Sequence, residues 1–346
     1  MSSRTIAVAV CLLASLVGCP DAVRGTAPRE ADGGSGDGGV ETQRDAAALA
    51  TAPVRLAEAS GPLALGPEVV FVATGKGIVA VPKRGGTAVT VVADTLSRPI
   101  AADDTHLFYQ EESGYSNLEA VSHAGTNPRR VATNVDVKAL AVDQGRLFFG
   151  TNNSAVRAVD LDADGAVEAT LRARNPDAPA ILLALTPHYV VLLISDVYHE
   201  QRIVRRPRGS LEAAADEVVV KVSHVLALRT AGGVAYWLAE GAGIGAADIE
   251  GTSTSARVVG DAVAFDGGAL AVDADHVFWT SRTEGRLYRA PRATGVPEII
   301  ATGFTFADET LGQYEQLRTG SQGRLAVDGA AVYVSDETGV FRVPKP

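Results

Sequence analysis

Alternating carboxylates in one short segment are the pattern in this sequence that comes closest to a site for chemistry. The segment DLDADGAVE places Asp160, Asp162 and Asp164 at positions 1, 3 and 5, glycine at position 6 and Glu168 at position 9. Alternating carboxylates on a tight loop can converge on one point, the glycine permits a sharp turn, and the backbone carbonyl at position 7 is a further oxygen ligand. These four acidic residues are therefore a candidate calcium site.

A second interpretation of this segment stays open. The segment resembles the calcium loops of integrin-type propellers and the first half of an EF-hand, but Leu171 stands where an EF-hand has its bidentate glutamate. Asp and Gly are also ordinary residues of hairpin turns, and the matching hairpins PKRGG, SHAG and PRATG contain no acidic run. A plain hairpin is the favoured interpretation, and calcium is the one cofactor that the sequence suggests.

Other catalytic patterns are weak or missing. Gly75, Gly77 and Ala80 match a dinucleotide-binding spacing, but the following residues continue as a strand, not as the helix that this motif needs. The motifs GxSxG and HExxH and a Walker loop are absent from the sequence. A net charge of -10 opposes binding to nucleic acid, because phosphates would be repelled. Enzymatic activity is left undecided, and a non-enzymatic role is favoured.

The residues just described belong to a repeat. One short strand pattern, such as LEAVSH or VFRVPK, recurs about every forty residues. Two strand patterns precede it, as in LAVD and LFFG, and a fourth follows it in most copies. This arrangement predicts an all-β fold, a β-propeller of seven blades with four antiparallel strands each; six and eight blades are the alternatives. The seven copies begin at Ile78, Leu118, Val156, Ile203, Ile244, Leu287 and Val340.

The two ends of the repeat region predict how the ring closes. The last repeat stops at Pro346, directly after its third strand, which would leave an open sheet edge. The segment PVRLA, Pro53 to Ala57, matches the fourth-strand segment PEIIA, Pro297 to Ala301, in the spacing of its proline, aliphatic residue and alanine. We therefore expect the N-terminal segment to supply the missing fourth strand of the last blade.

The sixth repeat carries a family resemblance. The strand LAVD, then VFWT from Val277 to Thr280, then LYRAPRATG, resembles the YWTD repeat and the related NHL-type and DUF5050-like bacterial propellers. The resemblance covers nearly all of Pro53 to Pro346, although YWTD domains have six blades. It implies a propeller fold and a binding role, and it implies no reaction. In this register Trp279 lies in the second strand of its blade, where we expect it to be buried.

Aspartates end the first strand of four repeats, at Asp103, Asp143, Asp273 and Asp328. Because they recur, we predict that each builds the turn to the second strand, its carboxylate accepting backbone N–H bonds. In the first, fourth and fifth repeats this place is taken by Gly66, Thr186 and Arg229 or its neighbour.

One face of the predicted propeller is a candidate binding face. The loops from second to third strands and from blade to blade lie on that face. Tyrosines among carboxylates suit a protein or a basic ligand. The candidate residues are Glu112, Tyr115, Asp196, Tyr198, His199, Arg282 and Glu284.

The N-terminal fifty residues have a different character. Arg4 precedes an apolar run from Ile6 to Leu16 of signal-peptide length. Residues 16–19, LVGC, resemble the lipobox of bacterial lipoproteins, which implies cleavage before Cys19 and a lipid on its sulfur. We expect residues 1–18 to be a lipoprotein signal peptide, residues 19–50 a lipidated cysteine and disordered tether, and residues 51–346 the propeller.

These observations together predict a function class. We expect a lipoprotein of the bacterial cell envelope, anchored by lipid at the periplasmic face or the cell surface, whose propeller binds or scaffolds a protein or small ligand. Nucleic acid is not an expected partner. The alternative is a calcium-dependent propeller hydrolase or lactonase with its site in the central channel.

Overall fold

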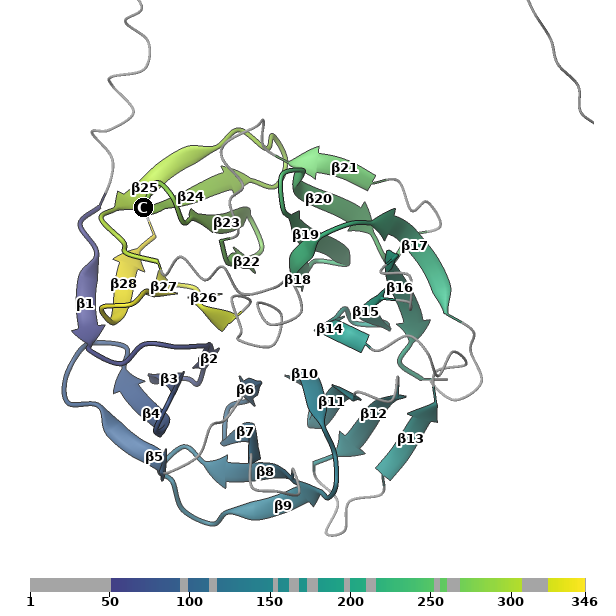
Figure 1. Cartoon of the computed structure of the whole chain (residues 1–346), viewed down its shortest axis with the longest axis horizontal. Helices are drawn as coiled ribbons and strands as arrows, with labels where there is room; N and C mark the ends of the chain where they lie inside the picture. The colour runs from purple at the N-terminus through teal and green to yellow at the C-terminus, as the bar shows by residue number, and fades with distance from the viewer. Residues whose placement is uncertain are drawn as a thin grey trace, which may run out of the picture. The chain divides into compact units, whose positions relative to one another are not determined.

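In the computed structural model, seven four-stranded antiparallel sheets stand as blades around a common axis (Figure 1). The structure describes residues 51–93, 99–111, 117–151, 155–161, 168–172, 180–195, 200–209, 216–251, 256–259, 268–306 and 323–345. All of its secondary-structure elements are strands. Within these residues, no helix has the length and apolar character needed to cross a membrane. The prediction of an all-β propeller with seven blades of four antiparallel strands is confirmed.

The first strand of each blade lies nearest the axis, and the fourth lies at the rim (Figure 1). Blade 1 contains β2 (Leu63–Leu65), β3 (Val69–Thr74), β4 (Gly77–Pro82) and β5 (Val89–Ala93). Blade 2 contains β6 (Ile100–Ala102), β7 (His106–Glu111), β8 (Asn117–Ser122) and β9 (Arg129–Ala132). Blade 3 contains β10 (Val137–Asp143), β11 (Arg146–Thr151), β12 (Ala155–Asp160) and β13 (Glu168–Arg172).

The remaining blades follow the same order around the ring. Blade 4 contains β14 (Ala180–Leu185), β15 (Tyr189–Ser195), β16 (Gln201–Pro207) and β17 (Glu217–Val222). Blade 5 contains β18 (Val225–Ala231), β19 (Val234–Ala239), β20 (Gly243–Asp248) and β21 (Ala256–Val259). Blade 6 contains β22 (Leu270–Val272), β23 (His276–Ser281), β24 (Arg286–Pro291) and β25 (Glu298–Thr302). Blade 7 contains β26 (Leu325–Val327), β27 (Ala331–Ser335), β28 (Val340–Pro344) and β1 (Val54–Ala57).

The N-terminal strand closes the ring as predicted. Strand β1 pairs antiparallel with β28, with Val54 opposite Arg342 and Arg55 opposite Phe341. The Arg55 guanidinium also donates to the carbonyl of Thr338 in the neighbouring turn. Because β1 covers the outer edge of β28, blade 7 has its full set of four strands.

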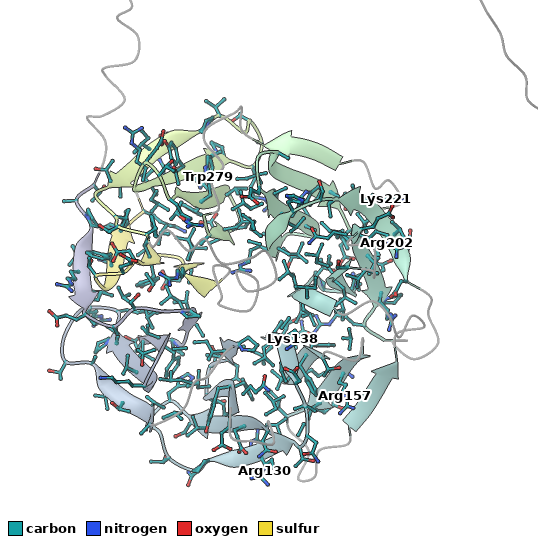
Figure 2. All side chains as sticks on the ribbon, viewed as in Figure 1. Arg130, Lys138, Arg157, Arg202, Lys221 and Trp279 are labelled. Carbon is teal, nitrogen blue, oxygen red and sulfur yellow. The ribbon has the colours of Figure 1, made fainter. Side chains whose placement is uncertain are left out.

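The core lies between the blades. Each second strand has a neighbouring blade on both of its faces, so it is a continuous apolar run and not an alternating one. Seven hydrophobic clusters of described residues fill the seven interfaces between adjacent blades. Trp279 in β23 is fully buried, which confirms its predicted place, and its ring stacks on that of Tyr288 at 5.4 Å between centroids (Figure 2).

Candidate functional site: blade turns and the ring axis

The candidate calcium residues are described only in part. Asp160 is the last residue of β12, and its exposed carboxylate forms a 2.8 Å ion pair with Arg146, its cross-strand partner. Asp162 and Asp164 lie outside the described residues, and Glu168 is described only as the backbone of the first residue of β13. Among the residues that the structure describes, no group of three or more His, Cys, Asp or Glu side chains is placed to hold a metal ion. The contact observed for Asp160 is thus a structural ion pair, and the calcium interpretation stays a prediction.

The predicted binding face is also described only in part. Arg282 and Glu284 both lie in the hairpin between β23 and β24. The Glu284 carboxylate accepts a hydrogen bond from the hydroxyl of Tyr288 and lies 3.5 Å from Arg286 Nη1. Burial, together with this hydrogen bond, raises the pKa of Tyr288. The structure therefore brings Arg282 and Glu284 into one hairpin, while the other five candidates, Glu112, Tyr115, Asp196, Tyr198 and His199, lie outside the described residues.

Three of the four strand-end aspartates build turns as predicted. In each, one carboxylate oxygen accepts the backbone N–H groups of the residues two and three positions later, at 2.7–3.0 Å. These residues are Asp103, Asp273 and Asp328.

Asp143 departs from that prediction. Its strand is joined to the next by a two-residue hairpin, in which Gln144 and Gly145 both have positive φ, 51° and 72°. This turn geometry fits the twist of the two strands by itself, so no carboxylate is needed to shape it. Asp143 Oδ2 instead accepts a 2.6 Å hydrogen bond from Arg208 of blade 4. The predicted turn role is wrong for this residue.

Seven residues on the face opposite the predicted binding loops connect neighbouring blades. Each directly follows the third strand of its blade, and its backbone N–H donates to a carbonyl in the turn between the first two strands of the same blade. That hydrogen bond fixes where the side chain starts. We call these residues the bridging residues: Lys83, His123, Leu161, Arg208, Ile249, Arg292 and Lys345.

Three bridging cations bind strand-end aspartates of the preceding blade at 2.6–2.9 Å. These pairs are Lys83 with Asp328, Arg208 with Asp143, and Lys345 with Asp273. Arg292 faces blade 5, whose first strand ends in alanine and not in aspartate, and donates to the hydroxyl of Tyr236 at 2.6 Å and to the carbonyl of Ala231 at 2.8 Å. The side chain thus takes whichever acceptor the preceding blade supplies.

The three remaining bridging residues make ring or apolar contacts to the preceding blade. The His123 ring lies 5.0 Å from that of Phe71. Ile249 shares a buried cluster with Val191. Leu161 packs against the cluster that contains Phe108. These three bridging residues therefore make ring or apolar contacts, and Leu161 does so although the first strand of blade 2 is followed by Asp103.

Burial and hydrogen bonding act in opposite directions on the aspartates of these pairs. Burial alone would raise the pKa of Asp273, but hydrogen bonds from Lys345 and from the backbone of His276 and Asp275 hold the pKa below its ordinary value. The pKa of Asp328 is lowered in the same way, with Lys83 as the cation. A carboxyl with a lowered pKa stabilises the fold at neutral pH, and this contribution is lost in acid.

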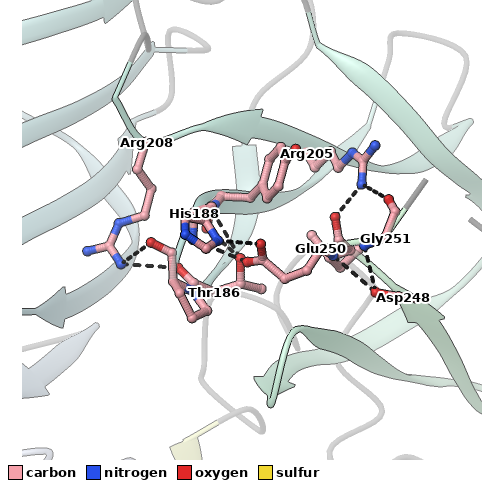
Figure 3. Close-up of polar contacts among 10 residues, drawn as sticks. Thr186, His188, Arg205, Arg208, Asp248, Glu250 and Gly251 are labelled. Carbon is pink, nitrogen blue, oxygen red and sulfur yellow. Dashed lines mark hydrogen bonds and ion pairs between the residues drawn. The ribbon is translucent and has the colours of Figure 1, made fainter. Parts of the chain in front are cut away.

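A second set of contacts joins blades 4 and 5 (Figure 3). The Glu250 carboxylate of blade 5 accepts a 3.1 Å hydrogen bond from the backbone N–H of His188. It also lies 2.6 Å from Nδ1 of the His188 ring. Arg205 of blade 4 donates to the carbonyls of Ile249 and Gly251. Figure 3 also shows Arg208 at the carbonyl of Thr186, within blade 4. The turns on this face are therefore fixed to one another by polar contacts.

The ring axis has one exceptional residue. In every blade, one residue of the first strand stands opposite the third residue of the second strand, and we call this the axial position. Six blades have alanine there and blade 5 has arginine. The seven are Ala64, Ala101, Ala141, Ala184, Arg229, Ala271 and Ala326.

This alignment corrects the register assumed for blade 5. The strand-end aspartates stand two residues after the axial position, so their counterpart in blade 5 is Ala231 and not Arg229. Arg229 is half-buried, and its Nη1 donates to the carbonyl of Leu228 at 2.9 Å. Burial lowers the pKa of Arg229 to about 10, so the side chain is still charged at neutral pH. The sequence analysis predicted neither the bridging residues nor the axial positions. The repeat does show both: the bridging residues are the last letter of each third-strand copy, and the axial positions form a column of alanines.

Comparisons with known proteins identify the fold and nothing finer. No family model and no curated protein matches the chain. Among solved structures, the crystal structure of the computationally designed Ika8 protein, in a P63 packing, is similar with a TM-score of 0.55 and 12% sequence identity. The match covers 86% of this chain and 100% of that chain. A likeness at this identity supports the fold assignment alone.

Proposed function

We propose that this protein is a lipoprotein of the bacterial cell envelope whose propeller is a rigid binding or scaffold module. Lipid on Cys19 anchors the chain, and residues 20–50 tether the propeller to the membrane. The partner is a protein or a small ligand and not nucleic acid, in keeping with the net charge of -10.

The observation that most supports a binding role is the closed ring with its bridged interfaces. All seven bridging residues fix the blade turns on one face. The opposite face is left to the loops from second to third strands and from blade to blade, such as the β23–β24 hairpin with Arg282 and Glu284. A rigid scaffold that presents loops on one face is a common basis for recognition.

The calcium-dependent hydrolase is the weaker proposal. Such a site needs carboxylates that converge near the axis. Apart from Asp143 at the end of β10, the charged residues of the seven first strands are Lys138 and Arg229, both of them cations. Cationic side chains do not supply the oxygen ligands that a divalent cation needs.

The lipid anchor is tested by labelling with a palmitate analogue in a bacterial host that processes lipoproteins. We expect Cys19→Ser to lose the label and to leave unprocessed precursor or a soluble species. Cys11→Ser, a matched change within the predicted signal peptide, should keep both label and membrane association. A labelled Cys19→Ser variant contradicts the anchor.

The binding face is tested with a photo-cross-linking residue in place of Glu284. We expect it to capture a discrete envelope component, whereas the same residue at Thr294, exposed in the β24–β25 turn on the other face, should not. Equal capture at the two positions contradicts the assignment of the face.

A further inference from the structure

The strand that closes the ring is also the strand through which the N-terminal fifty residues are joined to the propeller. Residues 1–50 precede Thr51, and β1 begins three residues after it, at Val54. A load on the N-terminal segment therefore passes along the chain into β1 before it reaches any other strand. In Figure 1, β1 lies at the rim of the ring, next to β28. Closure of the ring and attachment of the N-terminal segment thus depend on the same four-residue strand.

Side-chain burial contributes little to holding β1 in place. Three of its four residues pair with β28 through the backbone, and Leu56 is the buried one. The Val54 side chain is 53% exposed, and Arg55 is exposed as well. By comparison, all five residues of β27 in the same blade are buried. Because buried apolar area supplies much of the stability of a packed strand, β1 is held less firmly than the inner strands of its blade.

The chain is anchored differently on the two sides of β1. Before the strand, the Thr51 N–H donates a 3.0 Å hydrogen bond to the carbonyl of Ile300 in blade 6. After the strand, the Pro62 carbonyl accepts a 2.9 Å hydrogen bond from the backbone N–H of Ala73 in blade 1. Gly61 packs so closely on blade 1 that a Cβ would lie 1.9 Å from the carbonyl oxygen of Ala73. From Gly61 onward, therefore, the chain is packed into blade 1.

This difference sets a limit to what tension can release. A strand loaded at one end loses its hydrogen bonds in succession, because each pair takes the load only after the pair before it has opened. Parts of a fold with few buried contacts open at a lower cost than the whole fold does. We propose that tension on the N-terminal segment releases β1, with residues 51–60, from blades 6 and 7 while the other strands stay folded.

Release of β1 changes the surface of blade 7. It uncovers the outer edge of β28, Val340–Pro344, whose backbone groups then become open to an added strand. The lipid on Cys19 supplies the fixed point against which tension acts, so the role of this release in the cell rests on the proposed function. The release itself depends on the contacts of β1 alone.

The release is tested by stretching single molecules of the full chain, made without lipid, in optical tweezers. Cys11→Ser leaves the Cys19 thiol as one attachment point, and Ala242→Cys, at an exposed residue of the β19–β20 hairpin, supplies the other. We expect a first event that lengthens the molecule by at most about 35 Å, because each of ten extended residues spans about 3.5 Å. The blades should unfold in later events at higher force, and relaxation after the first event should restore β1.

Two matched variants assign the first event to β1. Leu56 and Val219 are residues of outer strands that are skipped in the pairing with the third strand, and they are 8% and 7% exposed. We expect Leu56→Ala to lower the force of the first event and Val219→Ala, in blade 4, to leave it unchanged.

Three results would overturn the proposal. They are a single event that releases the whole propeller, a first event whose force Leu56→Ala does not lower, and one whose force Val219→Ala lowers equally. All three are measured without lipid, so they are independent of the labelling of Cys19 that tests the anchor.

Discussion

The bridging residues and the axial positions are two seven-membered sets in the same repeat, and they vary in opposite ways. The bridging residues differ from blade to blade: three are cations that bind a strand-end aspartate, and Ile249 packs in the cluster that contains Val191. The axial position keeps alanine in six blades and changes to arginine in one, while its partner Tyr236 stays aromatic. The bridging residues thus vary at every interface, whereas the axial position varies in blade 5 alone.

The largest expected effect is on the closure that both sets require. Deleting Pro53 to Ala57 removes β1 together with its buried residue Leu56, and exposes the edge of β28. We expect a loss of about 4 kcal/mol or more of unfolding free energy, because a strand's hydrogen bonds and its apolar contacts disappear together. Chemical denaturation of the full chain measures this loss. Deleting residues 20–49 is the control and should change little; equal losses in the two deletions would contradict the closure.

A smaller effect on the free energy of unfolding distinguishes the contact between blades from the hydrogen bonds within the turn. Asp273 and Asp103 accept the same backbone hydrogen bonds, but Asp273 also binds Lys345, whereas the bridging residue opposite Asp103 is Leu161. We expect Asp273→Ala to cost about 2–3 kcal/mol and Asp103→Ala about 1 kcal/mol. Thermal or denaturant melts of both variants give the comparison. Equal costs would mean that the bridge adds nothing to stability.

The same pair predicts a pH dependence. The pKa of Asp273 is lowered in the folded protein, so its stabilising contribution is complete above the ordinary carboxyl pKa and is lost as the pH falls through the folded value. The stability difference between wild type and Asp273→Ala should therefore be constant from pH 7 to about pH 5 and shrink below about pH 4. Melting curves across this range test the sign; a difference that grows in acid is the contrary result.

Arg229→Ala should change stability in the opposite direction. Because burial lowers the pKa of Arg229, the charged side chain costs folding free energy at every pH below about 10. We expect the variant to be more stable than the wild type by about 1 kcal/mol at pH 7, after the loss of contacts made by the arginine stem. This gain should decline above pH 10. A clear loss of stability on melting at pH 7 would place Arg229 with the packing residues.

The smallest expected effect concerns the hairpin after Asp160. Its carboxylate already pairs with Arg146, so added calcium should shift the melting temperature very little. Asp162→Ala with Asp164→Ala provides the comparison. A calcium-induced rise that is present in the wild type and absent from this variant would restore the calcium interpretation.

The sequence predicted the architecture because each repeat contains the apolar strand patterns and the turn residues that form one blade. The apolar runs of the second strands, such as VFWT with Trp279, report burial on both faces. The match between Pro53–Ala57 and Pro297–Ala301 predicted the strand that pairs with β28. Turn chemistry was equally local at Asp103, whose carboxylate binds backbone groups within three residues.

Contacts between blades could not be predicted from local sequence patterns. Lys345 and Asp273 are 72 residues apart in sequence, and Arg208 and Asp143 are 65 apart. Each strand pattern shows where a side chain begins but not which blade receives it. Asp143 binds Arg208 although it builds no turn, because the Gln144–Gly145 hairpin has positive φ at both residues.

The axial position depended on register, which only the tertiary structure decided. In β18 the pairing shifts between Val225 and Ala227, and a bulge of one residue moves every later residue relative to a count along the sequence. The sequence placed Arg229 or its neighbour at the aspartate position, whereas the pairing of β18 with β19 places Ala231 there. Side chains alternate between the two faces of a strand, so the register determines which residues face each interface and which share the axis. The repeated strand pattern therefore determined the blades. The pairing of the strands determined that Arg229 occupies the position that alanine occupies in the other six blades.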